Sequence, residues 1–221
     1  MEPPRHSQEP ARLAALRALD ILDTAPERDF DDAVALAARI CDTPMALVSL
    51  VDAERQWFKA ETGLGESETP RGSSICAHAI LQPDGWLEIA DTTADPRTAD
   101  NPLVCGAPDL RFYAGATLLG PEGLPLGTLC VLDRTRRVLT APQREGLRIL
   151  ARQVSRQLEL RAALRREAAL RAEMDHRVKN SLQAVGSLIR IQARMAGAEA
   201  RAALERAEAR ISASVVGGAM L

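Results

Sequence analysis

The feature that most constrains the fold is a long stretch without helix breakers. No proline occurs between Pro142 and Gly197. Thr140 can cap a helix at its start, and Pro142 can occupy the first turn. One helix of about 55 residues, roughly 80 Å at 1.5 Å per residue, therefore follows. A helix of that length exceeds a globular domain, so we expect part of it to need a partner.

Two apolar patterns run along this helix, and their phase differs. The first consists of Leu147, Ala151, Val154 and Leu158. The second consists of Leu160, Leu164, Leu170 and Met174. A phase shift of this kind is typical of a stutter in a parallel dimeric coiled coil. We therefore predict an intermolecular seam. The alternative is an amphipathic helix that packs back onto its own domain.

A second helix is predicted at residues 199–215, after Gly197. Its weaker apolar stripe consists of Leu204, Ala207, Ile211 and Val215. Two helices per chain, doubled by dimerisation, would form a four-helix bundle.

A polar face that contains His176 lies opposite an apolar stripe in the long helix. The stripe consists of Met174, Val178, Leu182, Val185, Ile189 and Gln192. At about 100° per residue, His176 and Asn180 lie about 160° from this stripe, so His176 should face solvent. Asn180 is one turn further along and can hydrogen-bond the imidazole. Cations stabilise an added phosphoryl group, and Arg177 and Lys179 provide them.

Residues 175–183, Asp-His-Arg-Val-Lys-Asn-Ser-Leu-Gln, resemble the phosphoacceptor box of sensor histidine kinases of the HisKA_2 and HWE type. The resemblance covers about the last 50 residues, in which the helix–helix pattern continues. It implies that ATP phosphorylates His176 on an imidazole nitrogen. The phosphoryl group would then pass to an aspartate of a response regulator. Carboxylates beside the histidine often act as bases in such kinases, which makes Asp175 a candidate.

The first two thirds of the chain predict an α+β domain with an antiparallel sheet. Two helices come first, with Leu13, Leu16, Leu19 and Leu22 on one and Phe30, Val34, Ala37 and Ile40 on the other. A hairpin at 45–52 and 56–60, a short helix at 74–81, a strand at 86–90 and a second hairpin at 111–119 and 126–133 follow. Residues 1–9 are rich in proline and polar residues, and we expect a flexible tail.

This layout resembles a GAF domain. The resemblance depends on two segments, Arg111-Phe112-Tyr113-Ala114-Gly115-Ala116 and the later Gly127-Thr128-Leu129-Cys130-Val131-Leu132-Asp133. The resemblance covers roughly residues 12–160. We place the sensor domain at 10–142, a signalling coiled-coil helix at 143–173, and the dimerisation and phosphotransfer region at 174–221. A GAF sensor domain implies a small-molecule ligand, whose identity the residues leave open.

Aromatic residues with a few polar groups are typical of small-molecule sites. The candidates are Trp57, Phe58, Cys76, His78, Trp86, Phe112 and Tyr113. The alternative is that they form the ordinary core of a small domain. Attachment of a bilin through Cys76, or of haem through His78, is a further and weaker alternative. The four cysteines have no metal-ligand or redox-motif spacing, so we expect buried thiols and no metal site.

Composition excludes several classes of partner. The net charge is −2 with 26% charged residues, so neither nucleic acid nor an acidic membrane is an expected partner. No apolar stretch of 18 residues and no secretory signal is present, so we expect a cytoplasmic protein.

These observations predict the sensory and phosphoacceptor part of a two-component sensor histidine kinase that acts as a homodimer. Neither a Gly-rich phosphate loop nor an Asn-bearing nucleotide box is found in the sequence. We therefore expect ATP and Mg²⁺ to be bound by an ATP-binding catalytic domain outside these residues, in a longer kinase. The alternatives are a histidine phosphotransfer protein without a kinase domain of its own, and a GAF dimer that binds a small molecule without phosphotransfer.

Overall fold

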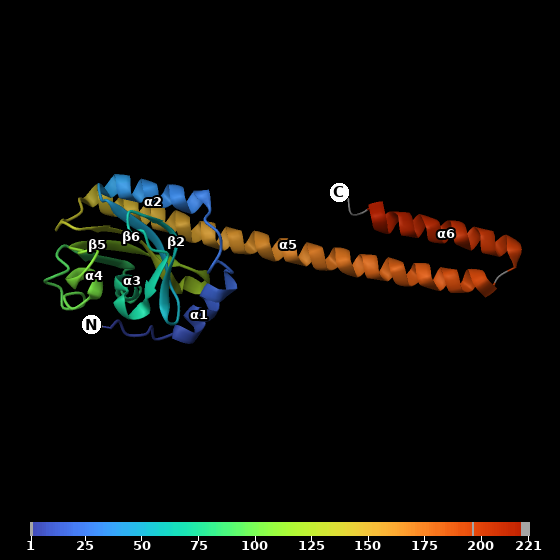
Figure 1. The fold of residues 1–221 in the computed structure, drawn as a ribbon, viewed down its shortest axis with the longest axis horizontal. Coiled ribbons are helices and arrows are strands. Elements are labelled where there is room, and N and C mark those ends of the chain that lie inside the picture. The colour runs from blue at the N-terminus through green and yellow to red at the C-terminus, as the bar shows by residue number, and fades with distance from the viewer. Residues whose placement is uncertain (1, 196, 218–221) are drawn as a thin grey trace. The chain divides into compact units, whose positions relative to one another are not determined.

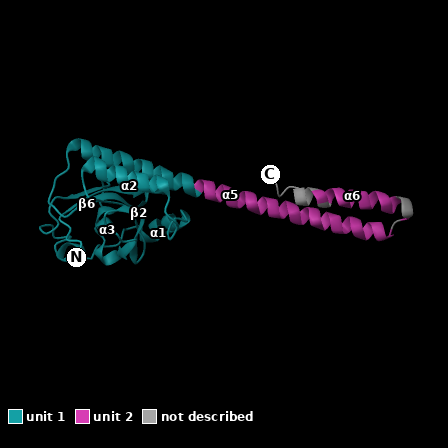
Figure 2. Ribbon diagram, turned by 45° about the horizontal axis from the view of Figure 1, so that its top comes forward, with its two compact units in different colours: residues 1–162 teal, residues 163–221 magenta. Residues whose placement is uncertain are grey.

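The computed structural model describes residues 2–195 and 197–217. These residues form two compact units, 1–162 and 163–221, of which Figure 2 shows the described parts. The helix α5 contributes to both units, and each unit is described by itself below.

Six strands in the described residues form one antiparallel sheet with the order β3-β2-β1-β6-β5-β4 (Figure 1). The strands are β1 (Met45–Val51), β2 (Arg55–Thr62), β3 (Glu68–Pro70), β4 (Trp86–Ile89), β5 (Phe112–Leu119) and β6 (Pro125–Asp133). Both predicted hairpins are present. The sheet places β1 beside β6, so the two hairpins meet in the middle.

Helices cover both faces of the sheet. The described helices are α1 (Glu9–Ala18), α2 (Arg28–Cys41), α3 (Ile75–Ala79), α4 (Pro102–Cys105), α5 (Ala141–Met195) and α6 (Ala198–Gly217), with 3-10 turns η1 (Arg71–Ser73) and η2 (Pro121–Gly123). Residues of α1, α2 and the first part of α5 share one buried cluster with the sheet, which we call the helix-side core. Residues of α3 and α4 share a second cluster on the opposite face, which we call the α3-side core.

The helix α1 is shorter than its leucine spacing predicts. It ends at Ala18, and Asp20 takes a positive φ of 47°, so the last two leucines of the pattern, Leu19 and Leu22, lie beyond the helix. The short elements β3 and α4 were missed, because three or four residues are too few to show a period.

The N-terminal residues are held against the domain, contrary to the expected flexible tail. Arg71 donates hydrogen bonds to the carbonyls of Pro3 and Pro4, at 3.0 and 2.8 Å. Glu9 begins α1 and accepts two hydrogen bonds from the buried Arg12. A buried guanidinium needs acceptors for its donors, and this segment provides two of them to each arginine.

The first part of α5 is packed on the sheet of its own domain. Leu147, Ala151, Val154 and Leu158 are between 0 and 4% exposed, and all four belong to the helix-side core. Our prediction of an intermolecular seam was therefore wrong for these residues. A buried helix face and a coiled-coil seam use nearly the same spacing of apolar residues.

The second unit contains the rest of α5 and the helix α6, as the sequence predicts. The apolar stripe of α6 is partly buried at Leu204, Ala207 and Ile211, whereas the side chain of Val215 lies outside the described residues. Residues 218–221, which we assigned to the same region, also lie outside them. Among the described residues, no helix is long and apolar enough to span a membrane.

Candidate functional site

His176 is exposed on α5 in the second unit, as predicted from its position opposite the apolar stripe. Its neighbours Asp175, Arg177 and Asn180 are also exposed, and Lys179 is half-buried. The ring is therefore open to a reactant from solvent.

Asn180 is the residue of this group that contacts the imidazole. Its side-chain nitrogen lies 3.4 Å from Nδ1 of His176, one helical turn away. The contact occupies Nδ1, so Nε2 remains open to solvent. Arg177 instead forms an ion pair with Glu173 at 2.6 Å, and both side chains are more than half exposed. A surface pair of this kind is weak, so its guanidinium can be released to bind another anion.

The single apolar stripe of the prediction divides into two faces. Leu182 and Ile189 are half-buried, and Gly186 and Ala193, each four residues further on, are buried, so this face packs on α6. Arg190 forms an ion pair with Glu208 of α6 beside it. At about 100° per residue, the second face lies about 90° from the first and about 160° from His176.

The second face is apolar and exposed in the single chain. Its side chains are 46 to 66% exposed, and they are Leu170, Met174, Val178, Val185 and Leu188. Several exposed apolar side chains in one stripe are typical of a protein–protein interface. The histidine therefore lies on the opposite side of the helix from the surface that most needs a partner.

The seven candidate ligand residues of the sensor domain are divided between the two faces of the sheet. Trp57, Phe112 and Trp86 contribute to the helix-side core. Phe58, Cys76 and Tyr113 contribute to the α3-side core, and His78 is buried on α3. Neighbouring residues in a strand point to opposite faces, so Trp57-Phe58 and Phe112-Tyr113 cannot line one cavity. The structure does not bring the seven together.

The α3-side core leaves little space for a ligand. The cavity that Phe58, Cys76 and Tyr113 border has a volume of about 20 Å³, and leucines and Ile75 form most of its remaining wall. A space of that size admits about one water molecule. The described residues contain no group of three or more His, Cys, Asp or Glu side chains that could hold a metal ion.

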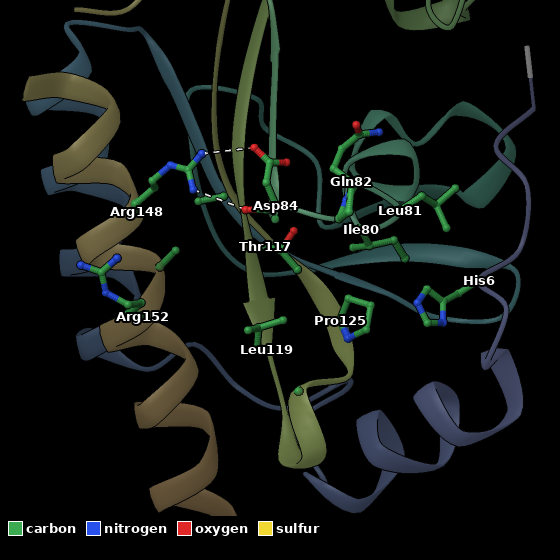
Figure 3. A pocket seen from close by; sticks show the side chains of 15 residues that line it. His6, Ile80, Leu81, Gln82, Asp84, Thr117, Leu119, Pro125, Arg148 and Arg152 are labelled. Atoms are coloured by element: carbon green, nitrogen blue, oxygen red, sulfur yellow. Dashed lines mark hydrogen bonds and ion pairs between the residues drawn. The ribbon is translucent and has the colours of Figure 1, made fainter. Parts of the chain in front are cut away.

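A wider cavity of about 470 Å³ lies between α5 and the end of β5, where Arg148 and Arg152 approach Thr117 and Leu119 (Figure 3). None of the seven candidates lines it. Arg148 pairs with Asp84 at 3.5 Å, and its guanidinium lies 4.9 Å from the centre of the Trp86 ring. Trp86 therefore packs under an arginine of α5.

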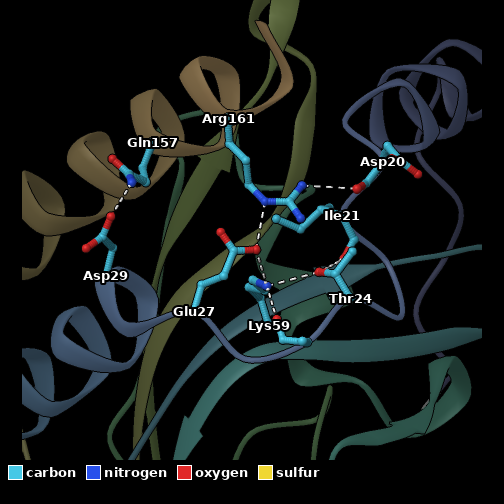
Figure 4. Close-up of polar contacts among 9 residues, drawn as sticks. Asp20, Ile21, Thr24, Glu27, Asp29, Lys59, Gln157 and Arg161 are labelled. Carbon is cyan, nitrogen blue, oxygen red and sulfur yellow. Dashed lines mark hydrogen bonds and ion pairs between the residues drawn. The ribbon is translucent and has the colours of Figure 1, made fainter. Parts of the chain in front are cut away.

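A polar network links the sheet to α5 near the end of the first unit (Figure 4). Lys59 is fully buried and donates to Glu27 at 2.7 Å, as well as to Thr24 and the carbonyl of Ala25. Arg161 of α5 donates to the same Glu27 oxygen at 2.7 Å. Burial raises the pKa of Glu27, but the hydrogen bonds from the two cations lower it by more, so the net direction is downward.

A β-bulge in β2 puts two consecutive side chains on the helix side of the sheet. Phe58 pairs with Ser49 and Ala60 pairs with Val48, so Lys59 is the extra residue of β2. Lys59 points to the helix side like Trp57 two residues before it, and the bulge brings Ala60 to the same side, where it joins the helix-side core. The sequence reasoning missed the network, although a lysine within the apolar run of a predicted strand was a signal for it.

Cys105 is exposed, contrary to the expected buried thiol, whereas the other three cysteines are buried.

Two known families match the chain. Residues 25–158 match the GAF domain family, and residues 173–216 match the histidine kinase family HisKA_2. A cyclic di-GMP phosphodiesterase of Pseudomonas aeruginosa is 47% identical over 135 residues, which are 61% of this chain and 23% of the relative. The sensor histidine kinase PdtaS of Mycobacterium tuberculosis is 41% identical over 88 residues, which are 39% of this chain and 17% of that protein.

The chain spans less than a quarter of the length of these curated relatives. Among solved structures, the GAF domain of a phosphoenolpyruvate-protein phosphotransferase from Coxiella burnetii has a similar fold. The TM-score is 0.52 at 16% identity, over 74% of this chain and 99% of that one. From the matched residues and the sheet with its covering helices, the chain belongs to the GAF domain family and continues into a HisKA_2 histidine kinase region.

Proposed function

We propose that this chain is the sensory and phosphoacceptor part of a two-component sensor histidine kinase, with His176 as the phosphoacceptor. The observation that carries the proposal is the solvent-exposed imidazole of His176, with Asn180 at 3.4 Å, within the HisKA_2 match. Exposure is required because both the nucleotide and the receiver must reach the same nitrogen.

The contact with Asn180 bears on the tautomer of the ring. With the amide nitrogen at Nδ1, as in the structure, Nδ1 accepts and Nε2 carries the proton. For attack by Nε2 the amide turns by 180°, so that its oxygen accepts a hydrogen bond from Nδ1–H and Nε2 carries the lone pair. Nε2 then attacks the γ-phosphorus of ATP, the bond from phosphorus to the bridging oxygen breaks, and ADP leaves. ATP and Mg²⁺ are held by a separate ATP-binding domain. Arg177 and Lys179 stabilise the phosphoryl charge, and Asp175 is a candidate base.

The partner of the exposed apolar face is a second copy of this chain. Two such faces, packed together with α6 of each copy, form a four-helix bundle that leaves both His176 rings outside. The phosphoryl group then passes to a response-regulator aspartate. We place the protein in the cytoplasm.

The network of Lys59, Glu27 and Arg161 offers a route from the sensor domain to the phosphoacceptor helix. It joins β2 and the start of α2 to α5 one residue before the first unit ends. A small-molecule ligand that alters the sheet would thereby alter the ion pairs that fix α5 to the sensor domain. We expect such a ligand to require rearrangement of the α3-side core, whose cavity is small.

One observation favours a second candidate function, a GAF module that binds a small molecule without phosphotransfer. The relative with 47% identity to this chain is a phosphodiesterase by name, so a similar segment also occurs in a protein of a different activity. In this alternative, α5 and α6 serve only as an interaction surface.

The test is phosphorylation of this chain by the full-length kinase and ATP labelled on the γ-phosphate. We expect label that is stable to base and lost in acid, and we expect it to vanish in His176→Ala. The chain has three histidines, so His6→Ala is a matched control that should retain the label. Label that persists in His176→Ala would exclude the proposal. Label that arrives only from an unrelated kinase would favour a phosphotransfer protein, and none from any donor would favour the GAF module alone.

A further inference from the structure

A cluster of buried polar groups lies in the α3-side core, and neither phosphotransfer nor packing requires it. Its members come from β1, α3, β5 and β6, and they are Ser49, Cys76, Tyr113, Thr128 and Cys130. All five are at most 2% exposed. Buried polar groups in an apolar core cost free energy unless they are paired, so a set of five calls for an explanation.

Two thiols form the centre of this cluster. The sulfur atoms of Cys76 and Cys130 lie 3.7 Å apart, although the residues are 54 positions apart in the chain. The Tyr113 hydroxyl lies 3.4 Å from Cys76 Sγ and 3.4 Å from the Thr128 hydroxyl. A Cβ on Gly115 would come within 2.4 Å of that hydroxyl, so the missing side chain is what allows the tyrosine to lie across the strand.

The Ser49 hydroxyl is a further buried polar group of this cluster. It is fully buried and has no hydrogen-bond partner among the described residues. It is nevertheless close enough to Cys76 to lower the pKa of that thiol. Burial raises the pKa of Cys76, but the surrounding hydroxyls and the Cys130 thiol lower it by more, to about 7. Burial and the proximity of Cys76 raise the pKa of Cys130.

We propose that Cys76 and Cys130 form a peroxide-reactive dithiol within the sensor domain. The Cys76 thiolate attacks one oxygen of hydrogen peroxide, the O–O bond breaks, and Cys76 sulfenic acid and hydroxide form. The Cys130 sulfur then attacks the Cys76 sulfur and water leaves. In sum, two thiols lose two electrons and two protons, and the peroxide becomes two molecules of water.

The cavity beside Cys76 defines the size of the oxidant. Its volume of about 20 Å³ is that of about one water molecule, so it excludes organic peroxides and larger disulfides, and hydrogen peroxide, the smallest peroxide, enters with a slight displacement of the wall. The reaction is therefore selective for hydrogen peroxide, and in a reducing compartment the disulfide is reversible. The proposal is independent of phosphotransfer at His176.

The test treats the folded 221-residue chain with hydrogen peroxide and maps the cross-link by peptide mass spectrometry without reductant. We expect one disulfide between the peptides of Cys76 and Cys130, with the loss of two hydrogens. Cys105→Ser is a matched control, because Cys105 is exposed and outside the cluster, and it should leave the yield unchanged. Cys130→Ser should abolish the cross-link and leave a sulfenic acid on Cys76, which dimedone traps when the oxidised chain is unfolded in its presence.

A second measurement uses the wild-type chain and therefore does not depend on the folding of a variant. In the wild-type chain, a bulky disulfide reagent should modify Cys105 readily and Cys76 at least tenfold more slowly, although peroxide oxidises Cys76. Oxidation of Cys105 alone in folded protein would overturn the proposal. A cross-link that forms only after denaturation would also overturn it.

Discussion

The two parts of α5 use the same kinds of residues and differ in what covers them. In residues 141–162 one apolar face is buried on the sheet of the GAF domain, as at Leu158, which is 1% exposed. In residues 163–195 one apolar face is covered by α6 and another remains exposed, as at Leu170, which is 62% exposed. One continuous helix thus contributes first to a domain core and then to a surface that needs a partner.

An apolar period on a helix does not identify the surface that covers it. Leu147, Ala151, Val154 and Leu158 have the spacing of a coiled-coil seam, but the sheet of the same chain covers them. The shift in phase after Leu158 remains meaningful. It marks the place where the helix changes partner, because a different side of the helix must then be apolar.

The sharpest test of this comparison is a matched pair of leucines two positions apart. Leu158→Ala should lower the free energy of unfolding of the sensor domain by about 2–5 kcal/mol, because it opens a cavity in a packed core. Leu160 is 57% exposed and is the control. Leu160→Ala should change the free energy of unfolding by no more than about 0.5 kcal/mol. Urea unfolding followed by tryptophan fluorescence measures both.

Equal costs for the two variants would contradict the packing of the first part of α5. A loss of unfolding free energy in Leu160→Ala alone would point instead to an intermolecular seam in this part of the helix.

The sequence was most informative where residue type and the spacing of apolar residues indicate the same element over many positions. The two hairpins, α2, α5 and the exposed side of His176 follow directly from spacing. The pairing of β1 with β6 depends on which strands become neighbours, and period alone contains no such information. The split of Trp57 from Phe58 did follow from the predicted strand, because adjacent residues of a strand point to opposite faces. The network at Glu27 also joins residues that are more than 30 positions apart in the chain. A long-range ion pair of this kind leaves no local pattern, apart from a lysine in an apolar strand.

The second prediction concerns the network that holds the first part of α5. Lys59→Ala removes hydrogen bonds to Glu27, Thr24 and the Ala25 carbonyl, and should cost about 1.5–3 kcal/mol of unfolding free energy. Glu27 keeps Arg161 as a partner in this variant, so we expect less than the cost of an isolated buried charge. Thermal unfolding at pH 7 measures the change.

The same network should give a characteristic acid dependence. The pKa of Glu27 is lower in the folded chain than its ordinary value of about 4.3, so its contribution to stability is full above that pH. The contribution is lost as the pH falls through the folded pKa. The stability difference between wild type and Glu27→Gln should therefore be constant near neutral pH and shrink as the pH falls through about 4.3 and then through the lower folded pKa. Glu159→Gln, on an exposed position, is the charge-matched control. A difference that stays constant with pH would contradict the role of the Glu27 charge.

The smallest expected effect on the sensor domain comes from the other part of α5, and there the readout is mass. Leu170→Lys places a charge on the exposed apolar face and should leave the unfolding free energy of the GAF domain within about 0.5 kcal/mol of wild type. It should nevertheless convert a dimer into a monomer at micromolar concentration, because an interface would have to bury an unpaired ammonium. Gln183→Lys adds the same charge about 180° from Met174, on the side of His176, and should stay dimeric. If light scattering gives one mass for wild type and both variants, the exposed face is not the dimer interface. The two parts of α5 would then differ in burial, but the second part would not serve dimerisation.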